Sequence, residues 1–135
     1  ATPIRAVQAQ RLVRRLCTQC ARPHAVPHNI EAEAAVFAHK VLPGMAPRWM
    51  EAGGCPNCMN TGYRGRLGIF ELMLIDDAIR DLVAQNVDSK RIKRQAVANG
   101  MRTLRVDGAR KVLRGMTSIA EVLRATEEET VVAEV

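Results

Sequence analysis

Residues 55–75 read Cys-Pro-Asn-Cys-Met-Asn-Thr-Gly-Tyr-Arg-Gly-Arg-Leu-Gly-Ile-Phe-Glu-Leu-Met-Leu-Ile, a C-x-x-C pair followed by a short apolar run. The run begins after Gly65 and is continuous, which is typical of a buried strand. Upstream, the segment Cys17-Thr-Gln-Cys20 repeats the C-x-x-C spacing. The sequence therefore predicts a strand that follows one cysteine pair, with a second pair far away in the chain.

The two cysteine pairs have the spacing of a tetrahedral zinc site. A two-residue spacer lets both sulfurs of a pair reach one ion at about 2.3 Å, and two pairs complete the tetrahedron. The four predicted ligands are Cys17, Cys20, Cys55 and Cys58. Because protein sulfurs would fill every position, the predicted zinc is structural and has no room for water or substrate. Closing the loop of residues 21–54 costs little beside the ~10–16 kcal/mol of a structural zinc site.

Other chemistry for the cysteines stays open at this point. Two disulfides would need an oxidising compartment, and the chain shows no signal peptide. A redox-active C-x-x-C pair is a further alternative. An iron–sulfur cluster would use the same four thiolates. Three histidines are possible substitute ligands: His24, His28 and His39. Because four thiolates already satisfy the ion, we interpret these histidines as ordinary loop or surface residues. Basic residues beside the pairs would offset the negative charge of a four-thiolate zinc centre or remain solvated: Arg14, Arg15, Arg22, Arg64 and Arg66.

Composition favours a single domain without nucleic-acid or membrane-spanning features. The chain has 135 residues, of which 47% are hydrophobic and only 3% aromatic, so its core is built from aliphatic side chains that suit helices. The net charge of +6 suggests phosphate binding, but the aromatic stacking platforms of single-strand binders are nearly absent. No apolar run approaches the ~18 residues of a transmembrane helix. We therefore expect a soluble protein without a nucleic-acid partner.

Helical patterns dominate after Ile75. Four starts are marked by capping residues: Asp76, Asp88 or Ser89, Thr103, and Thr117 or Ser118. Gly100 and Gly115 are placed to end the second and third helices in the left-handed conformation. Ser118 and Glu121 have capping-box spacing. Four short amphipathic helices in succession predict a small bundle.

The first half of the chain is less regular. Residues 6–16 fit a helix or a strand equally well. Residues 17–60 are rich in Pro, His, Gly and Cys and predict an insertion with little core of its own, apart from a helical interlude at residues 30–41 that Pro43 and Gly44 would end. The tail of residues 127–135 carries three consecutive glutamates and is expected to fray.

The sequence lacks the common catalytic and phosphate-binding motifs. It contains no G-x-x-x-x-G-K-[ST], no G-x-G-x-x-G and no G-x-S-x-G segment. Residues 62–68 are glycine-rich, but they enter a predicted strand, whereas a phosphate loop follows a strand and opens a helix. We therefore assign no catalytic or nucleotide-binding residue to this chain.

Four stretches carry a family resemblance: residues 9–17 (Ala-Gln-Arg-Leu-Val-Arg-Arg-Leu-Cys), 54–72, 76–80 (Asp-Asp-Ala-Ile-Arg), and 100–126 with Gly-Met-Arg-Thr-Leu, Asp-Gly and Gly-Met-Thr-Ser-Ile-Ala-Glu-Val-Leu-Arg-Ala-Thr. In order and spacing they resemble the tetracysteine insertion and helical C-terminal subdomain of type II secretion E-protein ATPases, close kin of type IV pilus assembly ATPases. The resemblance covers nearly the whole chain except residues 21–53 and the acidic tail.

The resemblance implies an α+β, mainly helical fold. Residues 6–16 and 65–75 would be antiparallel neighbours at the edge of a motor fold, joined here by the cysteine insertion. It also implies four parts: residues 1–16 as an edge strand continuing from an upstream ATPase core, 17–60 as the zinc-binding insertion, 61–126 as a strand plus four-helix subdomain, and 127–135 as a tail.

The resemblance further implies that this chain is the C-terminal domain of a secretion motor. ATP and Mg²⁺ would bind in an upstream core that precedes Ala1. The partners would be that core, neighbouring subunits of a hexameric ring and inner-membrane platform proteins, at the cytoplasmic face of the bacterial inner membrane. A different class of function, a stand-alone zinc-ribbon adaptor that binds protein or nucleic acid, remains the alternative.

Overall fold

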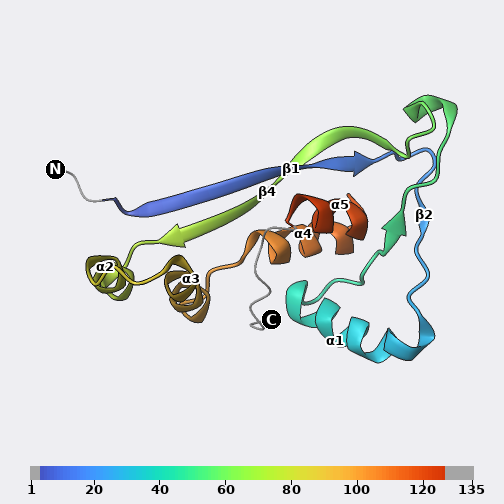
Figure 1. Cartoon of the computed structure of the whole chain (residues 1–135). Helices are drawn as coiled ribbons and strands as arrows, with labels where there is room; N and C mark the ends of the chain where they lie inside the picture. Colours follow the sequence, from blue (N-terminus) through green and yellow to red (C-terminus); the bar gives the residue numbers. More distant parts are fainter. Residues whose placement is uncertain (1–3, 127–135) are drawn as a thin grey trace.

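A long two-stranded ribbon is the backbone of the fold in the computed structural model, which describes residues 4–126 (Figure 1). Strand β1 (Ala6–Leu16) pairs antiparallel with β4 (Tyr63–Leu74), with Gln10 opposite Phe70 and an irregularity between Arg14 and Leu16. The α+β class and the antiparallel strand pair are thus confirmed. Residues 6–16, ambiguous in the sequence, form a strand because β4 supplies the pairing partner.

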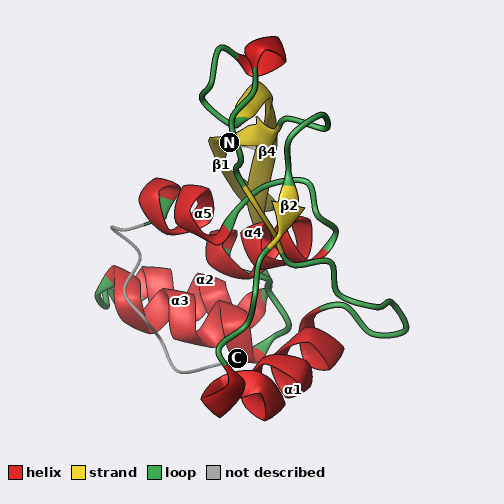
Figure 2. Cartoon of the chain, turned by 90° about the vertical axis from the view of Figure 1, so that its right-hand side faces the viewer, coloured by secondary structure: helices red, strands yellow, loops and turns green. Residues whose placement is uncertain are grey.

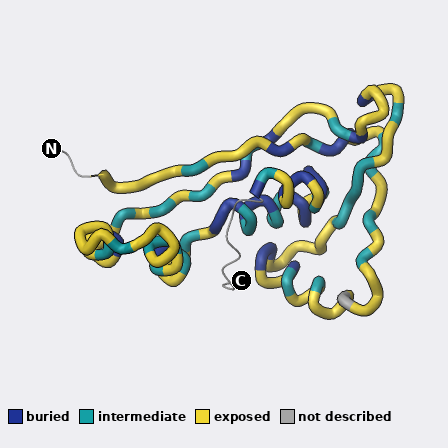
Figure 3. The backbone as a smooth tube through the Cα atoms, in the orientation of Figure 1, coloured by how far each residue is buried: buried dark blue, intermediate teal, exposed yellow. Residues whose placement is uncertain are grey.

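One face of the ribbon is covered by helices and the other is exposed (Figure 3). The covered face supplies Val13, Leu67 and Ile69 to the main core, where Ile69 is 0% exposed. These side chains alternate with exposed ones, as the pleat of a half-buried strand requires. Toward the far end of the ribbon, Leu72 and Leu74 are exposed.

The cysteine insertion leaves β1 and returns to β4 through short elements. They are β2 (Arg22–Pro23), η1 (His28–Ile30), α1 (Glu31–Val41), β3 (Met50–Glu51) and η2 (Pro56–Cys58). Strands β2 and β3 pair antiparallel and bring the two halves of the insertion together, and α1 lies at its end (Figure 2). The helical interlude expected at residues 30–41 is confirmed.

The insertion is also attached to the helical part of the molecule. Ala38, Val41 and Leu42 are buried against Leu113, which is 0% exposed. The backbone N–H of Arg48 donates to the Leu113 carbonyl at 2.7 Å. The apolar side chains of α1 and of the turn after it therefore pack on one patch of α4, rather than forming a core within the insertion.

The C-terminal part contains α2 (Asp77–Ala84), α3 (Ser89–Ala98), α4 (Leu104–Leu113) and α5 (Ile119–Ala125). Each begins at an N-cap whose side chain accepts a backbone N–H, namely Asp76, Asp88, Thr103 and Ser118. Gly100 (φ 103°) and Gly115 (φ 76°) follow the second and third helices in the left-handed region. The predicted starts and stops are confirmed.

These helices pack as two pairs along the ribbon (Figure 1). Helices α2 and α3 contact each other near one end, while α4 and α5 contact each other and cover β1 and β4. A Cβ atom on Gly108 of α4 would lie 2.5 Å from Val122 Cγ1 of α5, so the close approach of this pair requires glycine. Among residues 4–126, no helix is long and apolar enough to cross a membrane.

Candidate metal centre

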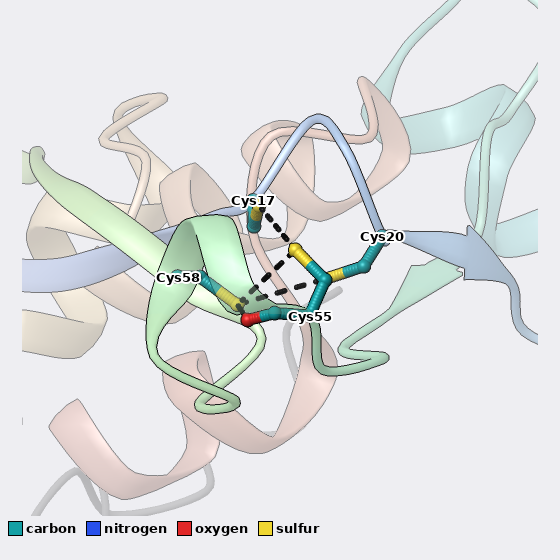
Figure 4. Close-up of side chains that lie close together, drawn as sticks. All are labelled: Cys17, Cys20, Cys55 and Cys58. Atoms are coloured by element: carbon teal, nitrogen blue, oxygen red, sulfur yellow. Dashed lines mark hydrogen bonds between the residues drawn. The ribbon is translucent and has the colours of Figure 1, made fainter.

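The four cysteines converge where the insertion leaves and rejoins the ribbon (Figure 4). Cys17 directly follows β1, and Cys20 ends the turn after it. Cys55 precedes the single turn of η2, and Cys58 is its last residue. All four sulfur atoms lie within 4.8 Å of one another, and the four thiols are free of disulfides. The structure thus brings together the residues that the spacing predicts.

The sulfur spacing matches a tetrahedral ion. The Sγ atoms of Cys17 and Cys55 are 3.8 Å apart, those of Cys20 and Cys58 are 3.7 Å apart, and those of Cys55 and Cys58 are 3.8 Å apart. Four sulfurs at about 2.3 Å from a central zinc ion would be separated by about 3.8 Å. A disulfide would instead require about 2.05 Å. The donor set and its geometry therefore fit Zn²⁺.

Backbone N–H groups point at two of the sulfurs. Gly54 N–H donates to Cys20 Sγ at 3.2 Å, and Gly62 N–H donates to Cys58 Sγ at 3.1 Å. Gly62 has φ 84°, and a Cβ atom there would lie 2.5 Å from the Ala52 Cβ atom. The glycine-rich stretch after the second pair therefore serves close backbone approach around the cysteines, and from Tyr63 it continues into β4 as expected.

The thiols have unequal proton affinities. Burial raises the pKa of Cys58, but hydrogen bonds from the Cys55 and Gly62 backbone outweigh burial and leave this pKa below its ordinary value. The pKa of Cys17 is also lowered, chiefly by a backbone hydrogen bond from Gln19. Burial raises the pKa of Cys20. The lowered pKa values make the thiolate that zinc requires easier to form at Cys17 and Cys58, and a bound cation would favour it at all four cysteines.

A buried carboxylate fixes the strand that leads into the first cysteine pair. Glu121 of α5 is 2% exposed and accepts from the Arg14 backbone N–H at 2.8 Å and from the Arg14 guanidinium at 2.9 Å. Arg124 donates to the same carboxylate. Although burial raises the pKa of Glu121, the hydrogen bonds from these two arginines lower it to about 2. These contacts of Glu121 with Arg14 and Arg124, called the Glu121 joint below, hold β1 against α5 three residues before Cys17.

The predicted capping box of Ser118 and Glu121 is confirmed only in part. Ser118 Oγ accepts the Glu121 N–H as expected, but the Glu121 carboxylate binds arginines. Tyr63 Oη lies 2.7 Å from Ser118 Oγ, and the Arg14 guanidinium stacks 4.2 Å from the Tyr63 ring centre. Sequence reasoning missed this cluster because Arg14 and Glu121 are 107 positions apart.

The other flanking residues have separate partners. His24 lies 4.0 Å from Glu51, and His28 lies 3.1 Å from Glu31. Among the described residues, the metal-ligand cluster contains only the cysteines, so none of the three histidines belongs to it. Arg22 pairs with Glu51, and Arg64 donates to Asn57. Arg14 is engaged by Glu121, so most of the flanking arginines have a defined contact.

Comparison with known proteins places this arrangement in a family. A family described as "Type II/IV secretion system protein" matches residues 1–124. The chain belongs to this family. It is 44% identical over 123 residues to "Type II secretion system protein E" of Pseudomonas aeruginosa, covering 91% of this chain and 23% of that protein. The family assignment confirms the resemblance found in the sequence.

Relatives from both branches of the family are similar over nearly the same range. "Type II secretion system ATPase E" of Vibrio cholerae is 39% identical over 122 residues, covering 90% of this chain and 23% of that protein. "Type IV pilus assembly ATPase PilB" of Acinetobacter baylyi is 38% identical over 128 residues, covering 95% of this chain and 22% of that protein. The chain thus spans less than a quarter of the length of these relatives.

Proposed function

We propose that Cys17, Cys20, Cys55 and Cys58 bind one structural zinc ion. The observation that carries this proposal is the cluster of four sulfurs within 4.8 Å of one another, in which three sulfur pairs lie at 3.7–3.8 Å, the edge of a tetrahedron around zinc. Four thiolates suit zinc better than the hard cations Mg²⁺ and Ca²⁺, which prefer oxygen ligands. When bound, the ion would tie the end of β1 to the start of β4 and close the insertion at its base.

We further propose that this chain acts as the C-terminal zinc-binding domain of a secretion motor. Two of the similar proteins are named as ATPases, one of type II secretion and one of type IV pilus assembly. In such a protein, ATP and Mg²⁺ would bind to residues outside this segment, and the domain would contribute subunit contacts and a docking surface. Its partners would be an ATPase core, neighbouring subunits of a hexameric ring and platform proteins at the cytoplasmic face of the inner membrane.

Within the domain, we propose a division into functional parts. Residues 1–16 would continue the sheet of the ATPase core, since β1 presents an outer edge that β4 does not pair. Residues 17–60 would form the zinc-binding insertion, residues 61–126 the strand and helical subdomain, and residues 127–135 a tail. A β-strand edge with unpaired backbone groups is a ready site for further strand pairing, which supports the first assignment.

Elemental analysis tests the zinc site. Protein purified without chelators should contain one zinc per chain, and X-ray absorption should report four sulfur neighbours at about 2.3 Å. Cys55→Ser should lower the zinc content, whereas serine replacement of Thr18, an exposed residue inside the first C-x-x-C spacer, should not. Native protein with far less than one equivalent of metal, and with its sulfurs in disulfides, would contradict the proposal.

A chimaera tests the motor assignment. The matched segment of the Pseudomonas aeruginosa protein would be replaced by residues 1–124 of this chain, and secretion would be measured in cells that lack the native protein. We expect the chimaera to restore secretion and the same chimaera with Cys55→Ser to fail. If the unsubstituted chimaera accumulates to normal levels yet gives no secretion, the motor assignment is wrong for this chain, and an independent adaptor becomes the better interpretation.

A further inference from the structure

A polar side chain inside the second cysteine pair faces a sulfur of the first. Asn57 lies between Cys55 and Cys58, and its Nδ2 is 3.9 Å from Cys17 Sγ. The carbonyl side of the same amide, Oδ1, accepts a hydrogen bond from Arg64 Nη1 at 2.9 Å. Arg64 follows the cysteines on β4. Three residues from separate positions are therefore linked as Arg64, Asn57 and Cys17.

The hydrogen-bonding capacity of each group fixes the orientation of this link. A guanidinium has donors and no acceptor, so only the amide oxygen of Asn57 can face Arg64. The NH₂ group must then point the opposite way, toward Cys17. A zinc-bound thiolate has lone pairs and no proton, so a donor is the partner that it can accept. Arg64 thus fixes the amide orientation in which the NH₂ group of Asn57 can donate to Cys17 Sγ.

Cys17 has a backbone donor within its own pair, at Gln19, and the link adds a side-chain donor from the opposite pair. Cys20 accepts a backbone N–H from Gly54, and Cys58 accepts one from Gly62. Both glycines lie outside the two C-x-x-C pairs. For Cys17, the corresponding donor from the opposite pair is the Asn57 side chain. Because Cys17 is only 1% exposed, water has little access to take that place.

We propose that Asn57 is a positioning residue for the metal centre, held by Arg64 so that its N–H group stabilises the Cys17 thiolate. The inference rests on the proposed zinc site. Hydrogen bonds to ligating atoms orient them and reduce their excess charge, and loss of such partners typically lowers metal affinity about 10–100-fold. The long N···S distance and the exposed position of Asn57 place the expected effect near tenfold.

Four single variants separate hydrogen bonding from bulk charge. Asn57→Ala removes the whole amide. Asn57→Asp has nearly the same shape and still accepts from Arg64, but it replaces the donor with a carboxylate oxygen. Arg64→Ala removes the orienting guanidinium. Arg66→Ala is the matched control, because Arg66 lies two residues along the same strand, is exposed, and has a side chain that makes no hydrogen bond or ion pair among residues 4–126. All four substitutions are at exposed positions and should leave the fold intact, which far-UV circular dichroism would check.

Zinc affinity and cobalt spectra are the measurements. Competition against a chelator should show about a tenfold weaker affinity for Asn57→Ala, a larger loss for Asn57→Asp, a smaller loss for Arg64→Ala and no change for Arg66→Ala. Adding Arg64→Ala to Asn57→Ala should have no further effect, since Arg64 acts through Asn57. In the cobalt-substituted protein, the thiolate-to-metal charge-transfer band should shift for the Asn57 variants and stay unchanged for Arg66→Ala.

The outcomes distinguish this inference from the zinc site itself. If the unsubstituted chain binds no zinc, the metal proposal fails. If the chain binds one zinc but the Asn57 and Arg64 variants match Arg66→Ala in affinity and spectrum, the metal proposal stands and the role of Asn57 is overturned. Equal weakening by Arg64→Ala and Arg66→Ala would also overturn it, because that result indicates a general effect of nearby positive charge.

Discussion

The cysteine insertion and the C-terminal helices are ordered in different ways. Helices α2 to α5 each begin at a side-chain cap, whereas η1 and η2 of the insertion have no side-chain cap. The strands of the insertion, β2 and β3, have two residues each, against 11 and 12 in β1 and β4. The helices carry their own local signals, while the insertion depends on the places where it is attached.

The two regions nevertheless share one helix. In α4, Val112 belongs to the core cluster beneath the ribbon, and its neighbour Leu113 belongs to the cluster formed with α1. Arg110 Nη1 also donates to the Val41 carbonyl at 3.2 Å. The insertion therefore has two anchors, the cysteines at its base and an apolar patch on α4. Each anchor can be removed separately by substitution.

Removing the metal should have the largest effect, and it should be confined to the insertion. A structural zinc site contributes roughly 10–16 kcal/mol of apparent free energy, far more than the patch on α4. After chelation or Cys55→Ser, amide exchange and proteolysis should increase between residues 18 and 57. The capped helices from Asp76 to Thr126 should keep most of their protection, because their caps and their contacts with Val13, Leu67 and Ile69 of the ribbon lie outside the insertion. Cooperative loss of protection in α4 and α5 would show that the two regions form a single folding unit.

Adjacent substitutions in α4 should separate the two clusters. Leu113→Ala should destabilise the chain by about 2–5 kcal/mol, because it empties a fully buried site. Its amide-exchange signature should appear in α1, where Ala38 and Val41 lose their partner. Val112→Ala should instead increase exchange in β4 and α5. If both substitutions affect the same amides equally, the clusters are one core, and the proposed second anchor does not exist as an independent contact.

The Glu121 joint should give the helical region a specific acid sensitivity. The pKa of Glu121 is lowered from 4.5 to about 2 in the folded chain, so its stabilisation is complete above pH 4.5 and is lost as the pH falls toward 2. Because Arg14 and Arg124 are about half exposed, we expect about 2–3 kcal/mol. Urea unfolding should show Glu121→Gln weaker than the native chain at pH 6 and nearly equal at pH 2.

Two controls sharpen this measurement. Zinc release in acid affects both proteins alike, so it cancels in the difference between them. Glu31→Gln changes a glutamate whose side chain is 67% exposed and should alter the stability little at any pH. A Glu121→Gln difference that stays constant between pH 6 and pH 2 would mean that the carboxylate acts through shape alone and not through its charge.

Local signals explain which parts of the structure were predictable. The helix starts were predictable from four N-cap residues: Asp76, Asp88, Thr103 and Ser118. The side chain of each cap accepts the backbone N–H of the third residue after it, so the signal is local in the sequence. The cysteine cluster was predictable for the same reason, since each C-x-x-C pair is a local device. The apolar pattern of residues 6–16 did not distinguish strand from helix, because a strand with one exposed face needs a distant partner to define it, and only the family resemblance supplied that partner.

The missed contacts all join residues that are far apart in the chain. The Glu121 carboxylate meets Arg14 across 107 positions, and the pattern at Ser118 suggested a local capping role for it instead. Leu113 of α4 packs against Ala38 and Val41 of the insertion, which are more than 70 positions earlier in the chain. Apolar side chains indicate that a helix has a buried face, but they do not indicate which segment will cover it.

The smallest predicted effect concerns the end of the molecule that is remote from the cysteines. Asp88 caps α3 by accepting the Arg91 N–H at 2.9 Å, and its site is exposed. Asp88→Ala should therefore cost about 1 kcal/mol, the usual value of a lost N-cap, and should increase amide exchange in α3 and its partner α2. Lys90→Ala, an exposed change in the same first turn, is the matched control and should be nearly silent. Zinc affinity and exchange in α1 should stay at native values in both variants. The α2–α3 pair lies at one end of the ribbon (Figure 1), whereas the cysteines follow the last residue of β1 and precede the first residue of β4. A weaker zinc site in Asp88→Ala would show that the stability of the two ends is coupled through the ribbon, and the contrast between a metal-anchored insertion and self-capped helices would then have to be abandoned.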